Sequence, residues 1–211
     1  MRLSLVVLVS FISLASFAQV DDVPDYRSKR ELFTRIQEKD IRSDVSTFSM
    51  GGIDEGVGKL PLQTIPVAET GDNFITFKGE NIKVTITTAP FDATKHKLGY
   101  YDNKHLVKID NKAFFGDYGK VPRTKIQDVT VIIDKDTIAI PPAAWGDLYN
   151  PILYVNDRGT NKTNNKVLLS KDGRKVYVYM LKQESGGSYE VTWIIQDKKY
   201  LKRVVDFGFL K

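Results

Sequence analysis

The residue types that carry most enzymatic and metal chemistry are scarce in this chain of 211 residues. It contains no cysteine, which excludes a thiol nucleophile, a zinc–thiolate site, an iron–sulfur cluster and a disulfide scaffold. Its two histidines, His96 and His105, are nine residues apart among lysines, whereas a helical zinc site places two histidines at i and i+4. Neighbouring lysines repel a cation and so disfavour a metal site. We therefore expect both imidazoles to be ordinary surface side chains. We predict no metal and no cofactor.

Other catalytic arrangements leave no distinctive pattern. A G-x-S-x-G elbow is absent, and so is a calcium loop with alternating acidic residues and a glycine. The 26 acidic residues would supply a carboxylate pair for glycoside hydrolysis, but no pair stands out from the others. The sequence therefore predicts no catalytic residue and a non-enzymatic protein. The alternative is a carboxylate-based hydrolase that acts on an envelope or extracellular polymer.

Aromatic residues are the better candidates for a functional surface. Tyr100 and Tyr101 lie between polar residues in a predicted loop, and Trp145 lies in a connection that follows two prolines. Such rings stack on the faces of sugars and present a polar tip to water, so all three are candidate ligand-binding residues. The competing interpretation is that they plug the open ends of a β core. Trp193, in a strongly apolar segment, is expected to be core.

The N-terminus has the pattern of a secretory signal peptide. A short positive start, Met1-Arg2, precedes an apolar run that ends with small residues before Gln19, which predicts cleavage near Ala18. The run is shorter than the roughly 20 residues that span a bilayer, which disfavours the alternative of a membrane anchor. We therefore expect a periplasmic or secreted protein, with a single domain over 19–211, in which two lobes remain an option, and no transmembrane segment in the mature chain.

Export without cysteine is typical of bacterial envelope proteins, so the expected partner is a protein or glycan of the cell envelope and not nucleic acid. The chain has 31 Lys and Arg and 26 Asp and Glu, for a net charge of +5. Within residues 159–211 there are 11 basic and 5 acidic residues. This basic quarter suits an anionic partner, but lysines that cover solvent faces and sheet edges would give the same composition.

One amphipathic helix is predicted near the start of the mature chain, over residues 28–42. Its first residues, Ser28 to Glu31, fit the S-x-x-E capping box, and Phe33 and Ile36 should face inward onto a sheet. Residues 45–50 are expected to form a strand.

Further along the chain the hydrophobic period changes to two, as in half-buried strands. It predicts strands over 73–77, 82–87, 105–109, 125–133, 137–140, 166–170, 174–182, 189–196 and 199–209. The last four form a β-meander, in which Glu190, Thr192 and Gln196 should face mainly outward while Trp193 and its alternate neighbours face the core. The predicted fold is mainly β (α+β), with antiparallel sheets, this C-terminal β-meander and one N-terminal amphipathic helix.

The final run contains Asp172-Gly173-Arg174, Val176-Tyr177-Val178-Tyr179, Tyr189-Glu190-Val191-Thr192-Trp193 and Arg203-Val204-Val205. This pattern resembles that of uncharacterised exported proteins of Gram-negative bacteria and covers roughly residues 126–209. The resemblance implies an exported, β-rich protein and assigns no activity or site residue.

Overall fold

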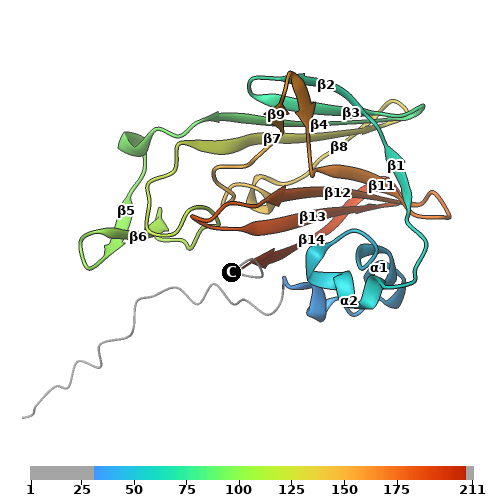
Figure 1. The fold of residues 1–211 in the computed structure, drawn as a ribbon, viewed down its shortest axis with the longest axis horizontal. Helices are drawn as coiled ribbons and strands as arrows, with labels where there is room; N and C mark the ends of the chain where they lie inside the picture. The colour runs from blue at the N-terminus through green and yellow to red at the C-terminus, as the bar shows by residue number, and fades with distance from the viewer. Residues whose placement is uncertain (1–30, 208–211) are drawn as a thin grey trace, which may run out of the picture.

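Two five-stranded antiparallel sheets stack face to face, and an N-terminal segment covers the outer face of one of them (Figure 1). The structure is a computed structural model that describes residues 31–207. It confirms the prediction of a mainly β fold with antiparallel sheets. The predicted signal peptide, residues 1–18, lies outside the described residues. Within 31–207, no helix combines the length and apolar composition needed to cross a bilayer.

Sheet A contains the C-terminal meander. Its strands, in spatial order, are β1 (Gln63–Ile65), β11 (Lys166–Leu169), β12 (Lys175–Lys182), β13 (Tyr189–Gln196) and β14 (Lys199–Phe207). From β11 to β14 each strand pairs antiparallel with the next one in the chain, which confirms the predicted meander. Gly173 adopts a positive φ of 69° in the β11–β12 turn, a conformation that favours glycine.

Sheet B contains the central strands. In spatial order these are β2 (Val67–Gly71), β3 (Phe74–Lys78), β4 (Ile82–Pro90), β7 (Thr124–Ile133) and β8 (Asp136–Ile138). The strands predicted over 73–77, 82–87, 125–133 and 137–140 are present, and they pair as the β3–β4 and β7–β8 hairpins. Pro66 separates β1 from β2, so the chain passes from sheet A to sheet B at this point.

Two smaller hairpins and two 3₁₀ turns complete the connections. They are η3 (Ala93–Lys95), the β5 (Leu98–Tyr101) and β6 (His105–Ile109) hairpin, η4 (Pro142–Ala144), and the β9 (Val155–Asp157) and β10 (Thr160–Lys162) hairpin. The β5–β6 hairpin extends beyond one end of the sandwich (Figure 1).

The main core lies between the sheets. Val84 and Val131 of sheet B pack in the same cluster as Val178 and Trp193 of sheet A. Trp193 is fully buried, as predicted, and its indole N–H donates to the carbonyl oxygen of Ala144 at 2.7 Å. That bond satisfies the only polar atom of a large apolar side chain, so the ring is buried without leaving an unpaired donor.

A second core lies on the other face of sheet A. It is covered by the N-terminal cap, residues 31–56, which contains η1 (Phe33–Arg35), α1 (Lys39–Val45), η2 (Met50–Gly52) and α2 (Ile53–Gly56). Phe33 and Ile36 are buried there, as predicted, against strand residues such as Tyr177 and Tyr179.

The prediction of one helix over residues 28–42 is wrong for the described part. The chain forms η1, continues with an extended backbone at Ile36 and Glu38, and only then enters α1. Glu31 accepts a hydrogen bond through its carbonyl oxygen from Val205 N–H at 2.7 Å, and Phe33 N–H donates to Asp206 at 2.9 Å. Backbone groups that a helix would pair internally are thus bound to β14. Ser28, the first residue of the predicted capping box, lies outside the described residues.

Two further predictions about this face are also wrong. Residues 45–50 form no strand: Val45 ends α1, residues 46–48 form a turn and Met50 begins η2, so that Val45 and Phe48, three residues apart, both pack in the core on sheet A. Glu190 and Thr192 do not face solvent, since the N-terminal cap leaves each of them 2% exposed. The sheet therefore has two covered faces.

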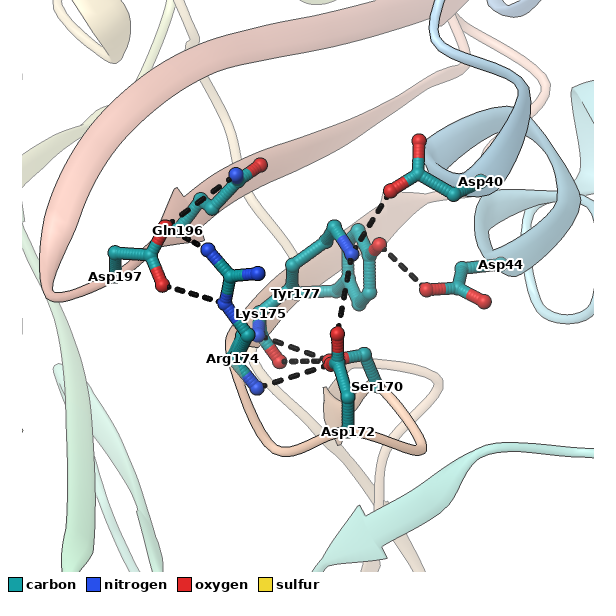
Figure 2. Close-up of polar contacts among 9 residues, drawn as sticks. All are labelled: Asp40, Asp44, Ser170, Asp172, Arg174, Lys175, Tyr177, Gln196 and Asp197. Atoms are coloured by element: carbon teal, nitrogen blue, oxygen red, sulfur yellow. Dashed lines mark hydrogen bonds and ion pairs between the residues drawn. The ribbon is translucent and has the colours of Figure 1, made fainter.

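Polar contacts fix α1 on the sheet. Figure 2 shows Asp40 and Asp44 of α1 pointing to Lys175 and Tyr177 of β12. The Lys175 ammonium lies 2.9 Å from Asp40, and the Tyr177 hydroxyl donates to Asp44 at 2.7 Å. The Lys175 side chain is buried but Asp40 is 63% exposed, so water still screens this ion pair on one side.

Two carboxyl groups lie side by side under the cap. Glu190 of β13 is paired in register with Asp206 of β14, and the backbone of Gly51 packs directly on both side chains. A Cβ at Gly51 would lie 2.9 Å from Asp206 Cγ, so a larger residue there would have to displace this carboxyl group. Burial, and then the charge of Glu190, raise the pKa of Asp206 to about 6, although the Phe33 N–H bond opposes them.

This raised pKa predicts a stability that grows in mild acid. The folded protein binds the Asp206 proton more tightly than the unfolded chain, so stability increases as the pH falls through about 6. We expect this group to add about 1 kcal/mol between pH 7.5 and pH 5. Urea unfolding at both pH values should show that Asp206→Asn loses this increment. An identical pH dependence in the variant and the wild type would contradict the assignment.

Candidate functional site

An apolar pocket of about 250 Å³ lies at the end of the sandwich where β12 turns into β13. We call it the aromatic pocket. Its main walls are Leu106, Phe114, Phe115, Tyr118, Ser188 and Phe207. These residues come from β6, from the loop that joins β6 to β7, from the β12–β13 turn and from β14. A concave, mostly aromatic surface with a few polar groups is the usual composition of a small-ligand site.

The long wall of the pocket, residues 110–123, is held by backbone bonds to three other parts of the chain. Gly119 accepts from Leu106 N–H of β6 at 3.0 Å, and Tyr118 N–H donates to Gly186 at 2.8 Å. Phe115 N–H donates to Asp147, also at 2.8 Å. These contacts fix a segment that has no regular secondary structure, so its pocket-facing side chains are held in place before any ligand arrives.

Close backbone approach explains two glycines at this site. A Cβ at Gly187 would lie 2.1 Å from the carbonyl oxygen of Gly116, which leaves no room for a larger residue. Gly119 has a φ of +70° and packs against the ring of His105, so a side chain there would be both strained and obstructed.

A fully buried lysine ties the pocket wall to the meander. The Lys182 ammonium donates to Asp117 at 2.7 Å, to Glu184 at 2.9 Å and to the carbonyl oxygen of Gly187 at 2.8 Å. Asp117 also accepts from the Asn150 amide at 2.7 Å. Burial alone would raise the pKa of Asp117, but the hydrogen bond and charge of Lys182 outweigh it and hold the pKa below its ordinary value. Asp117 is therefore ionised at neutral pH.

Aromatic rings pack tightly behind the pocket. Phe114 meets Tyr149 edge to face with ring centroids 5.7 Å apart, and Phe115 meets Phe207 at 5.6 Å. Burial, and then the charges of Asp110 and Asp147, raise the pKa of Tyr149 to about 12, so its hydroxyl stays neutral. The back wall is thus uncharged and apolar.

Tyr100 and Tyr101 lie on the neighbouring β5–β6 hairpin. Adjacent strand residues normally point to opposite faces, yet both rings are accessible, with exposures of 44% and 52%. A register shift between Gly99 and Tyr100 interrupts the pairing at this point. The prediction placed them in a loop. The structure places them in β5, a short strand of the hairpin that extends beyond the sandwich (Figure 1). Both rings are open to solvent there.

Trp145 lies elsewhere. It follows η4 and packs, partly buried, against the core between the sheets. Its indole N–H is buried and has no hydrogen-bond acceptor within residues 31–207. The structure therefore does not gather the three predicted ring residues on one exposed surface: two are open to solvent and the third contributes to the core.

Both histidines bind carboxylates through Nδ1, as a catalytic histidine often does. His96 lies 2.6 Å from Asp110, and His105 lies 2.9 Å from Asp102. No serine or threonine hydroxyl is a hydrogen-bond partner of either imidazole in the described part of the chain, so the nucleophile that completes a triad is not assembled there. Within 31–207, no three His, Asp or Glu side chains are grouped to hold a metal ion.

The carboxyl groups of Glu190 and Asp206 pack beneath the N-terminal cap and line none of the pockets described. Substrate would have to displace residues 49–51 to reach them. The arrangement at the aromatic pocket can bind an apolar group, and the one carboxylate in its lining, Asp117, is held in the ion pair with Lys182.

Comparison of the chain with protein-family models, with curated proteins and with solved structures finds no match.

Proposed function

We propose that this chain is an exported, non-enzymatic binding module that takes a component of the cell envelope, a protein or glycan, at the aromatic pocket and the adjoining β5–β6 hairpin. The observation that carries the proposal is the aromatic pocket itself, an apolar hollow whose walls are already fixed by backbone bonds and by Lys182. Sites of this kind bind without first ordering a loop, which saves much of the entropy cost of association.

Three further observations support the proposal. The leader-like residues 1–18 favour export, and the resemblance of residues 126–209 to exported Gram-negative proteins agrees with it. Tyr100, Tyr101 and Tyr118, the last 70% exposed, present rings beside the pocket or on the neighbouring hairpin. Exposed tyrosines in this number are typical of recognition surfaces, because a ring supplies contact area with little side-chain entropy to lose.

The tyrosines supply the test. In protein 19–211, the double substitution Tyr100→Ala and Tyr101→Ala should change the free energy of unfolding by no more than about 0.5 kcal/mol, since both rings are exposed. We expect it to weaken binding to an envelope extract or a glycan array at least tenfold, through loss of stacking area.

The matched control is Val57→Ala with Leu60→Ala, which trims two side chains that are 80% and 71% exposed in the connection after α2. Binding that survives the tyrosine substitutions and disappears in this control would move the site to the α2–β1 connection and contradict the proposal.

A further inference from the structure

A second pocket, of about 380 Å³, shares Asp117 as a wall with the aromatic pocket. We call it the basic pocket. Its polar walls include Lys120, Arg123, Asn150 and Glu184. One hollow is therefore almost wholly apolar, and its neighbour carries charged groups, with a single carboxylate between them.

The acids of the basic pocket are already paired, whereas its cations are not. Asp117 and Glu184 both accept from the buried Lys182 ammonium, at 2.7 and 2.9 Å. Within residues 31–207, neither the Lys120 ammonium nor the Arg123 guanidinium has a carboxylate within ion-pair distance. Both side chains belong to exposed residues. The charge that remains available to a ligand in this pocket is therefore positive.

The same imbalance extends over the surrounding segment. Residues 92–125 contain eight Lys and Arg but four Asp. Each of those acids has a side-chain partner: Asp92 pairs with Lys95 and Asp117 with Lys182, while Asp102 and Asp110 are hydrogen-bonded to the imidazoles of His105 and His96. A region with excess positive charge and occupied acids attracts anions and raises their local concentration.

We infer that the group recognised here is an amphiphilic anion, whose apolar body occupies the aromatic pocket and whose carboxylate, phosphate or sulfate lies in the basic pocket against Lys120 and Arg123. The inference rests on the proposed function and narrows its ligand chemistry. Arginine donates two parallel bonds to such oxygens and lysine supplies a point charge, so the two side chains together suit an anionic head.

The probes that test it are 1-anilinonaphthalene-8-sulfonate and N-phenyl-1-naphthylamine, which share the same ring system and differ by the sulfonate. We expect the sulfonated probe to bind protein 19–211 more tightly than the uncharged one, and to bind less tightly as salt is added. Lys120→Gln with Arg123→Gln removes both charge-assisted contacts and should weaken binding of the sulfonated probe at least tenfold, while binding of the uncharged probe should change less than twofold.

Two control variants accompany these measurements. Lys135→Gln with Lys166→Gln removes two exposed cations outside the site and should leave both probes unaffected. Ser188→Leu places a larger side chain in the aromatic pocket and should weaken both probes. Near-UV circular dichroism of every variant excludes the loosened states that also bind the sulfonated probe.

The outcomes separate the inference from the proposed function. If both probes bind but the affinity of neither changes in the Lys120 and Arg123 variant, the inferred anionic head is wrong and the proposed aromatic pocket is unaffected. If inorganic phosphate displaces the sulfonated probe as effectively as the uncharged probe displaces it, the inference that the ligand has an apolar body is wrong. If neither probe binds the folded protein, both the inference and the proposed site are wrong.

Discussion

Glu190→Ala should lose about 4 kcal/mol of unfolding free energy, among the largest losses of any single substitution in this protein. Its two carboxylate oxygens accept four bonds: from the Ser49 hydroxyl at 2.7 Å, Met50 N–H at 2.8 Å, Gly51 N–H at 2.6 Å and the Tyr179 hydroxyl at 2.7 Å. Truncation leaves the buried hydroxyls of Ser49 and Tyr179 without an acceptor, at about 1–3 kcal/mol each, and frees two N–H groups that are only part-buried. Chemical denaturation followed by tryptophan fluorescence measures the loss.

Two further variants sharpen this result. Glu190→Gln keeps the shape but can no longer accept on both ends, so an intermediate loss of about 2 kcal/mol is expected. Glu69→Ala, an exposed glutamate on β2, should stay within about 0.5 kcal/mol of the wild type. Equal losses for Glu190→Ala and Glu69→Ala would show that Glu190 does not hold the N-terminal cap on sheet A.

Lys182→Met should lose about 3–5 kcal/mol and, in the fraction that stays folded, bind either probe at least tenfold more weakly. The substitution fits the volume but leaves Asp117 without its ammonium partner, in a side chain that is 19% exposed. It also removes the bond to the carbonyl oxygen of Gly187. Gly187 belongs to the β12–β13 turn and packs directly on Gly116 of the β6–β7 loop, which forms the pocket wall. Stability and probe binding should therefore fall together.

The control for this prediction is Lys166→Met, which replaces an exposed lysine on β11 and should be nearly neutral. A second substitution, Asp117→Asn in the Lys182→Met background, removes the unpaired charge and should recover part of the loss. The pKa of Asp117 is lower in the folded protein than in the unfolded chain. Its contribution to stability is therefore complete above the ordinary carboxyl pKa and is lost as the pH falls through the lowered value. A double variant no more stable than Lys182→Met would contradict the ion-pair account.

The strands were predictable from the sequence because their pattern is local. In β4, Ile82, Val84 and Ile86 alternate with polar residues, and the burial follows that alternation. The turn at Asp172 and Gly173 also carries its own signal, since glycine supplies the positive φ. Where the side-chain period and the turn residues indicate the same structure, contacts with distant parts of the chain rarely change it.

The N-terminal cap was not predictable in the same way. Glu31, Phe33 and Glu190 are involved in bonds between segments more than 100 residues apart, and no local pattern records them. A glutamate that alternates with apolar residues indicates a solvent-facing position, and this holds only if nothing covers that face. The cap covers it, which reversed the prediction for Glu190 and Thr192.

The candidate site was partly visible in the sequence. Aromatic residues are dense from residue 91 to residue 118, and Phe114, Phe115 and Tyr118 among them line the pocket. Lys182 gave no such signal, because a lysine at a strand end indicates solvent. Its burial follows from three acceptors that the fold brings together, two of them from the β12–β13 turn. Of the two interpretations of the three candidate rings, exposed ligand surface or core plug, the structure gives the first for Tyr100 and Tyr101, in a strand and not in the predicted loop, and the second for Trp145.

The most direct test of the binding site is the set of NMR contacts between the sulfonated probe and protein 19–211. We predict nuclear Overhauser effects from the probe's rings to the side chains of Phe114, Phe115 and Phe207, which line the aromatic pocket. Contacts confined to Val57 and Leu60, the exposed apolar residues of the α2–β1 connection, would show that the pocket is not the binding site.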